Sequence, residues 1–157
     1  MGERRATATG EKTARRQRML TAAAELLKCW SYTDITMVRI ADQTGVAKGT
    51  LYLYFRTKES LFLQLYEERL GAWYAELESL AAQGAGTVKP AAAAPVIAST
   101  LSSRQTLIHL HGLLYSTLSR NIDLETTLIF RRRQSRRMSS LAAAFAGSSG
   151  SSPVATS

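Results

Sequence analysis

The chain has 157 residues, with 20 Lys and Arg against 12 Asp and Glu, and 45% of its residues are hydrophobic. This length allows one compact domain or a small head joined to a second module, and the composition excludes a chain that is disordered throughout. No apolar stretch is long enough to cross a bilayer and the N-terminus lacks an apolar secretory core, so we expect a soluble protein without a membrane partner.

The positive charge is concentrated at the two ends of the chain. Residues 1–20 hold six basic and two acidic groups, residues 61–130 hold four basic and six acidic groups, and residues 131–157 hold five arginines and no acid. This asymmetry points towards a polyanion, most simply nucleic acid, although an acidic membrane surface or solubility alone would also account for it. The single cysteine, Cys29, excludes an intramolecular disulfide and fits a reducing cytoplasm.

Apolar residues recur at three- and four-residue spacing along most of the chain, which predicts an all-α protein. Residues 1–12 show no such period, and we expect a disordered basic arm there. The helices are predicted at about residues 14–29, 37–44, 48–55, 58–80, 96–119 and 123–145. Between them, residues 81–95 are rich in Ala and Gly with two prolines and predict a linker, either without regular structure or with a short helical piece. The Ser/Gly-rich residues 147–157 predict a disordered tail.

The segment from Thr36 to Phe55 has the pattern of a helix-turn-helix unit. Such a unit needs a small residue where its helices cross, a glycine in the turn and apolar residues between the helices. These positions are filled by Ala41, by Gly45, and by Ile40, Val46 and Leu51. Any two packed short helices favour similar residues, so this pattern alone does not settle the function.

A longer run makes the interpretation specific. The sequence ITMVRIADQTGVAKGTLYLYFRTKESLF, Ile35 to Phe62, resembles the N-terminal DNA-binding domain of TetR-family transcriptional regulators, and the resemblance extends over about Thr13 to Trp73. The run HLHGLLYSTLSRNIDLETTLIFRR, His109 to Arg132, is similar to a helix pair in the ligand-binding and dimerisation domain of some members. The resemblance implies a head at residues 13–73, with recognition unit 36–55, and a helical regulatory and dimerisation domain at 74–146.

The resemblance also implies which residues contact DNA. Lys48 and Gly49 begin the recognition helix, where an ammonium can reach a base edge or phosphate and a residue without a side chain lets the backbone approach the groove. The positions that match phosphate contacts of the family are Thr36, Thr50, Tyr54 and Lys58, and Thr36 is also a natural N-cap.

Other residues of the head leave alternatives open. Arg39 either contacts phosphate or a base or is a solvated surface arginine, and Tyr52 either contacts DNA or packs on the head, whereas Phe55 is expected to pack. Leu53 is predicted to be exposed on the recognition helix and is counted with the DNA-contacting residues. Three arginines of the first helix, Arg15, Arg16 and Arg18, either supplement phosphate binding or remain solvated.

The chain departs from the family pattern in three places. Ala47 stands where a serine or threonine cap is common, Trp30 and Ser31 stand where a glycine-containing turn usually ends the first helix, and the C-terminal residues become Ser/Gly-rich where members usually continue into two long pairing helices. The resemblance therefore implies a shortened C-terminal domain, and it places homodimerisation through the usual surface in doubt.

The resemblance implies a pocket for a small-molecule effector within the helices after the head. The side chains that could line it are Trp73, Tyr74, His109, His111 and Tyr115, although aromatic residues at helical spacing are more often ordinary core. The two histidines are about 200° apart around a helix and cannot chelate one metal as an i, i+4 pair can. We find no arrangement typical of an enzyme, a metal site or a cofactor, and Arg131, Arg132, Arg133, Arg136 and Arg137 form either an exposed helix face or a non-specific phosphate surface.

The leading hypothesis is an all-α, TetR-like regulator, in the first instance a repressor, that binds a palindromic operator in double-stranded DNA and responds to an unknown effector. It would be cytoplasmic in a bacterium and associated with the nucleoid when bound to DNA. The alternatives are a shortened regulator that binds a protein partner without specific DNA binding, and a non-specific nucleic-acid binder that uses its basic termini.

Overall fold

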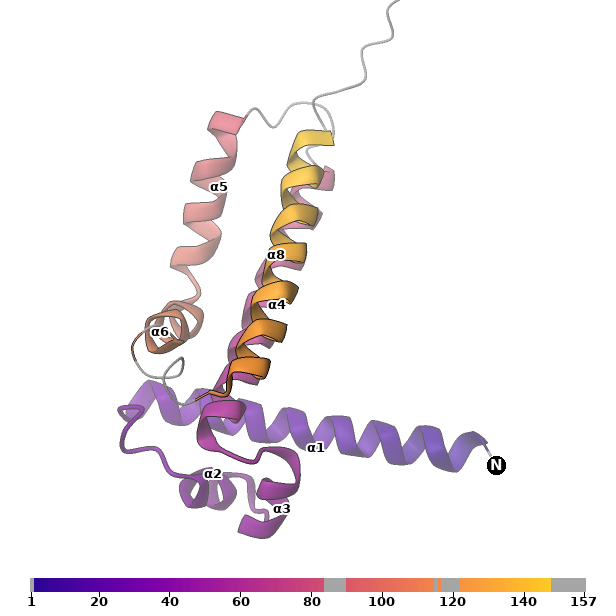
Figure 1. Ribbon diagram of the computed structural model, residues 1–157, viewed down its shortest axis with the longest axis vertical. Coiled ribbons are helices and arrows are strands. Elements are labelled where there is room, and N and C mark those ends of the chain that lie inside the picture. The colour runs from indigo at the N-terminus through magenta and orange to yellow at the C-terminus, as the bar shows by residue number, and fades with distance from the viewer. Residues whose placement is uncertain (1, 84–89, 115, 117–121, 148–157) are drawn as a thin grey trace, which may run out of the picture. The chain divides into compact units, whose positions relative to one another are not determined.

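The computed structural model describes residues 2–83, 90–114, 116 and 122–147, and all regular structure in these ranges is helical (Figure 1), as predicted. The helices are α1 (Gly2–Cys29), α2 (Met37–Thr44), α3 (Lys48–Tyr54), α4 (Lys58–Gln83), α5 (Pro90–Ser102), α6 (Gln105–Leu113) and α8 (Leu124–Gly147). They form two compact units, one of Met1–Glu67 with Leu110–Asn121 and one of Glu68–His109 with Ile122–Ser157. We call the first unit the head and the second unit the helical unit.

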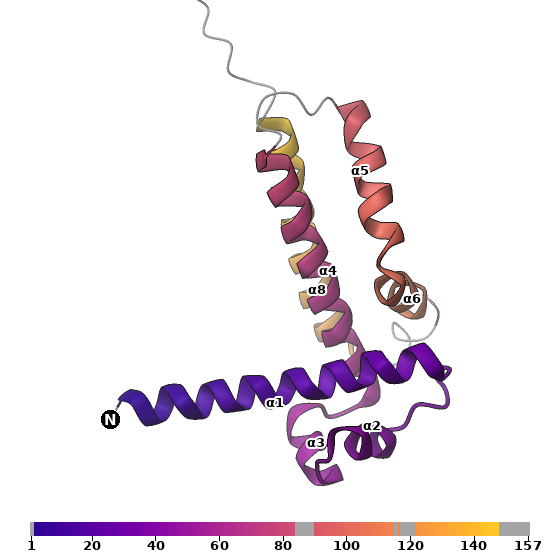
Figure 2. The same cartoon turned by 180° about the vertical axis from the view of Figure 1, so that it is seen from behind.

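The core of the head is built from one stripe of α1 and from the inner faces of α2, α3 and the start of α4. Met19, Leu20, Ile40, Leu51 and Phe62 are completely buried. Tyr32, in the turn after α1, packs edge-on against Phe62 with ring centroids 5.1 Å apart. Both ribbon views show α2 and α3 next to each other beside α1 (Figures 1 and 2), so the short helices of the recognition unit are held against a long one.

The prediction of a disordered arm at residues 1–12 is wrong, because α1 begins at Gly2. The segment contains no proline and several good helix formers, among them Glu3, Arg4 and Ala6. Once the packed half of α1 has formed, each added residue gains one backbone hydrogen bond without a new nucleus. The predicted end of this helix at Cys29 is confirmed.

In the helical unit, α8 runs beside the latter half of α4. Tyr74 on α4 is buried, and its Oη donates a hydrogen bond to the Met138 Sδ of α8 over 3.1 Å. A Cβ atom at Gly71 would collide with the Arg137 guanidinium, so the glycine allows this arginine to lie against α4. Because of this side-chain contact, the overlap of α4 and α8 in Figures 1 and 2 reflects true proximity.

The linker predicted at residues 81–95 is helical at both of its ends, and the alternative with a helical piece agrees with α5. Residues 81–83 belong to α4, and α5 begins at Pro90 and continues through Pro95, while residues 84–89 lie outside the described part of the chain. Alanine is the strongest helix former and proline is favoured in the first helical turn, so the segment's composition supports helix despite its low complexity.

Three predictions concern the chain after residue 95, and they have different outcomes. The helix predicted at 96–119 is divided into α5 and α6 by a break at Ser103 and Arg104. The helix predicted at 123–145 is confirmed as α8, with Asp123 accepting a hydrogen bond from the Thr126 backbone N–H over 2.8 Å. The tail expected at 147–157 lies outside the described residues from 148 onward.

Candidate DNA-binding site

The first helix of the recognition unit has a defined beginning and end. Thr36 is the N-cap of α2, because its side chain accepts a hydrogen bond from the Arg39 backbone N–H over 3.1 Å. Gly45 ends the helix in the left-handed region, at φ 67°, where a residue without a side chain is favoured. The backbone N–H of Val46 then bonds back to the Ala41 carbonyl over 3.1 Å. The predicted cap and turn are confirmed.

The second helix of the unit, α3, is held by a single buried anchor. Leu51 is completely buried, whereas Ala47 at the N-cap makes no side-chain hydrogen bond, as its lack of a polar side chain requires. The exposed residues of α3 are Lys48, Gly49, Tyr52 and Leu53, and Thr50 and Tyr54 are half-buried. The helix therefore presents one mixed face, in part cationic and in part apolar, to solvent.

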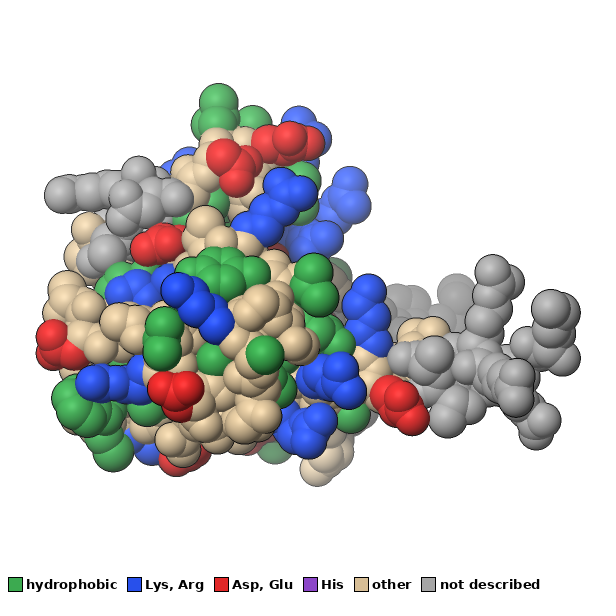
Figure 3. All heavy atoms as spheres, turned by 90° about the horizontal axis from the view of Figure 1, so that it is seen from below, with side chains coloured by type: hydrophobic (Ala, Val, Ile, Leu, Met, Phe, Trp, Pro, Cys, Tyr) green, Lys and Arg blue, Asp and Glu red, His purple; other side chains and the backbone are tan. Residues whose placement is uncertain are grey.

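Figure 3 views the molecule from the end where α2 and α3 lie. Lys and Arg side chains are spread over this surface among hydrophobic side chains, some Asp and Glu side chains, and the tan atoms of other side chains and backbone. On α3, the Lys48 Nζ lies 5.8 Å from the centroid of the Tyr52 ring. A surface of this kind combines phosphate attraction with side chains that can contact base edges.

Lys58 was predicted to touch a DNA phosphate, and the structure gives its ammonium protein partners. Its Nζ donates hydrogen bonds to the backbone carbonyls of Tyr32 and Ile35, each over 2.9 Å, and lies 4.1 Å from the centroid of the Tyr32 ring. Burial lowers the pKa of Lys58, and the carboxylates of Glu59 and Asp34 oppose that change. An ammonium has three N–H donors, so two are used to fasten the turn between α1 and α2 to the start of α4.

Tyr32 and Glu59 complete this connection, and neither is among the residues predicted from the sequence. The Tyr32 Oη donates a hydrogen bond to a carboxylate oxygen of Glu59 over 3.1 Å. Burial raises the pKa of the Tyr32 phenol, and the Glu59 carboxylate raises it further. The sequence holds one signal for this connection, which is a single aromatic residue among the polar residues Ser31, Thr33 and Asp34.

Arg39 stacks on Trp30 instead of extending into solvent. Its guanidinium carbon lies 3.7 Å from the centroid of the Trp30 ring, and its Nη1 is buried without a hydrogen-bond partner among the described residues. Trp30 is one of the departures from the family pattern, and here it provides an aromatic surface for the arginine. Contact of Arg39 with DNA stays a prediction.

The arginines predicted to supplement phosphate binding have different surroundings. Arg16 donates to the Gln64 side chain over 2.5 and 3.0 Å and lies over the Phe55 ring, which is itself buried as predicted. Arg15 and Arg18 are exposed on α1. The arginines of α8, Arg131, Arg132, Arg133, Arg136 and Arg137, all have exposed side chains.

The residues predicted for an effector pocket belong to both units and have different surroundings within them. Trp73 and Tyr74 stack with ring centroids 5.7 Å apart, and the Trp73 Nε1 donates to Thr100 over 3.0 Å. His109 is exposed, whereas the His111 Nδ1 lies 2.8 Å from the Tyr66 Oη. Tyr115 lies outside the described residues.

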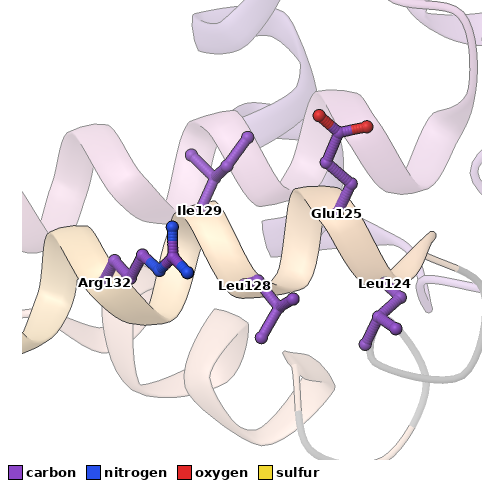
Figure 4. A pocket seen from close by; sticks show the side chains of 5 residues that line it. All are labelled: Leu124, Glu125, Leu128, Ile129 and Arg132. Atoms are coloured by element: carbon purple, nitrogen blue, oxygen red, sulfur yellow. The ribbon is translucent and has the colours of Figure 1, made fainter.

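A groove lies on α8. Its lining comes from Leu124, Glu125, Leu128, Ile129 and Arg132, whose side chains project from successive turns (Figure 4). The described residues contain no group of three or more His, Cys, Asp or Glu that could hold a metal ion. In the same part of the chain, no helix is long and apolar enough to cross a membrane.

The capped helix, the left-handed glycine turn and the anchored second helix define a helix-turn-helix protein. Comparison with known proteins agrees with this class. The family model "Bacterial regulatory proteins, tetR family" matches residues 19–65, and the model "Tetracyclin repressor-like, C-terminal domain" matches residues 67–149. The chain therefore belongs to the TetR family of transcriptional regulators, as its sequence predicted.

Two proteins that resemble this chain are named by the comparisons. It is 34% identical over 68 residues to the fatty acid metabolism regulator protein of Bacillus subtilis (strain 168), an alignment that spans 43% of this chain and 35% of that protein. A TetR-family transcriptional regulator of known structure from Haemophilus influenzae is 18% identical, with a TM-score of 0.49 over 91% of this chain and 90% of that one.

Proposed function

We propose that this regulator is a repressor that binds a palindromic operator as a homodimer and inserts α3 of each head into the major groove. The observation that carries the proposal is the division of α3 into a buried anchor, Leu51, and an exposed face of Lys48, Gly49, Tyr52 and Leu53. A helix fixed from behind presents its outer face with the rigidity that base contacts need.

Homodimerisation is supported by the unpaired apolar side chains of α8. Leu124 is 73% exposed and Leu128 and Ile129 are each more than 40% exposed on the groove of this helix. An exposed apolar surface of this kind commonly marks a protein interface. The same groove would also suit a different protein chain, which is the alternative of a regulator that acts through a protein partner.

We further propose that a small-molecule effector binds in the helical unit. Trp73 and Tyr74 contribute aromatic surface, and their polar atoms bond to Thr100 and Met138 on α5 and α8. A ligand that displaced these bonds would change the contacts of α4 with its neighbours. Since α4 begins in the head and ends in the helical unit, this change is a route by which an effector could release DNA.

Selection from random double-stranded DNA with the full chain tests the proposal, followed by affinity measurement on the selected site. We expect an inverted repeat, and a dimer mass by light scattering over a range of concentrations. Lys48→Ala combined with Tyr54→Ala should abolish binding to the selected site. As the matched control, replacing Arg131 and Arg133, which do not line the α8 groove, with alanine should lower only the affinity for unrelated DNA.

The outcomes separate the alternatives. If the double variant binds the selected site like the wild type, α3 is not the recognition helix. A monomer at all concentrations would contradict the homodimer and favour the protein-partner alternative. A chain that enriches no sequence and loses affinity only with the α8 arginines would be a non-specific binder.

A further inference from the structure

Leu53 on α3 is exposed to a degree that its chemistry does not explain. Its side chain is 85% exposed, the highest value among the exposed large hydrophobic side chains of the described residues. A leucine contributes to packing only through burial, and at this position it buries little of its surface, whereas its helix propensity is matched by Lys, Arg or Gln. The head therefore gains almost nothing from a leucine here.

The surroundings of Leu53 leave its side chain open to a partner. Gly49 lies one helical turn earlier on the same face of α3, and a Cβ atom added there would meet nothing within 4 Å. Gly49 therefore contributes no side chain that could cover Leu53 from the preceding turn. Lys48 and Tyr52 occupy the neighbouring row of exposed positions and contribute a cation and a phenol.

The chemistry of the major groove restricts what a leucine can recognise. Each base pair presents hydrogen-bond donors and acceptors there, and the C5 methyl group of thymine is the apolar group among them. Leucine has no donor or acceptor in its side chain, so it cannot distinguish the polar edges. Its favourable contact is burial of its own methyl groups against that of a thymine.

We propose that Leu53 contacts the C5 methyl group of one thymine in each operator half-site and selects a T·A pair at that position. This inference rests on the proposed function, because it requires α3 to lie in the major groove. It adds one specificity-determining contact to the proposed function. Polar contacts with the DNA are then left to Lys48 and Tyr52 on the same face of α3.

The test removes the methyl group from the DNA and the leucine from the protein. Each thymine of the selected operator is replaced in turn by deoxyuridine, which lacks only that methyl group, and dissociation constants are measured at one salt concentration for the full-length wild type and for Leu53→Ala. For the wild type we expect one symmetric pair of thymines at which the replacement weakens binding about fourfold in one half-site and about 16-fold in both.

For Leu53→Ala the same replacement should have no effect, because the partner of the methyl group has already been removed. Leu80→Ala is the matched control, since it deletes a leucine from the exposed face of α4 in the helical unit. This variant should show the wild-type response to every deoxyuridine.

Three results would overturn the inference. The first is that deoxyuridine weakens binding by the same factor in Leu53→Ala and in the wild type. The second is that Leu53→Ala binds the operator more weakly, although no deoxyuridine replacement weakens binding of the wild type. The second would place Leu53 against the sugar-phosphate backbone. A wild-type chain that selects no operator would instead refute the proposed function, and the inference with it.

Discussion

The recognition unit at residues 36–55 and the helix α8 are built in different ways. α2 and α3 have only 8 and 7 residues, and they depend on a cap at Thr36, a left-handed Gly45 and a buried Leu51. α8 has 24 residues, yet Leu141 is its one buried hydrophobic residue among those described. Short helices need tertiary anchors because nucleation is unfavourable, whereas a long helix of good formers needs fewer of them. Local geometry therefore constrains individual residues far more tightly in the recognition unit.

The largest test of this contrast compares two buried leucines. Leu51→Ala should lower the free energy of unfolding of the head by about 3 kcal/mol, because it removes the anchor of α3 and leaves a cavity. Leu141→Ala should cost less, since the rest of α8 has little buried surface to lose. Denaturant unfolding followed by circular dichroism measures both, and equal losses would contradict the contrast.

A test of intermediate size compares two lysines of the head. Lys58→Met should lower the free energy of unfolding by about 1.5 kcal/mol, because the carbonyls of Tyr32 and Ile35 lose a charged donor. It should leave the dependence of operator affinity on salt unchanged. Lys48→Met should leave stability unchanged and, if its ammonium neutralises a phosphate, reduce the slope of log affinity against log salt by about 0.9.

The outcome for Lys58 distinguishes two roles. A reduced salt slope in Lys58→Met would show that its ammonium contacts DNA, as the sequence predicted. Lys58→Arg is a control that keeps the positive charge but replaces the compact ammonium with a planar guanidinium. It should be little more stable than Lys58→Met, because a guanidinium does not fit the two carbonyls as the ammonium does.

The smallest test uses two glycines in opposite environments. Gly45→Ala should destabilise the head by about 1 kcal/mol, because a side chain is strained at a φ of 67°. Gly10 lies in α1, where a Cβ atom would meet nothing within 4 Å. Gly10→Ala should therefore stabilise this part of the helix by up to about 1 kcal/mol. Melting curves by circular dichroism would show opposite shifts, and two shifts of the same sign would contradict this assignment.

The sequence predicted the recognition unit well because the determinants there are local. Thr36, Gly45 and Ala47 have the predicted roles at the helix ends, and a cap or a left-handed turn involves residues only a few positions apart. The predictions failed or stayed open where helix propensity acts without amphipathic periodicity. Residues 2–12 and 90–95 form helix although neither has an apolar stripe.

The contacts made over longer distances could not be predicted. Lys58 matches a phosphate-contacting position of the family, and only the fold shows that its ammonium meets two carbonyls more than 20 residues earlier. The stacking of Arg39 on Trp30 also depends on how the turn after α1 is placed. Both contacts follow from tertiary packing, which the spacing of apolar residues does not define.

The two tryptophans of the chain are divided between its two units. Trp30, in the head, is 46% exposed beneath the Arg39 guanidinium, and Trp73, in the helical unit, donates its indole N–H to Thr100. Each unit therefore contains its own intrinsic fluorophore, in a distinct environment. With Trp73→Phe or Trp30→Phe, the emission of the remaining indole would report the opening of one unit alone, so the chain carries the means to tell whether its two halves unfold together.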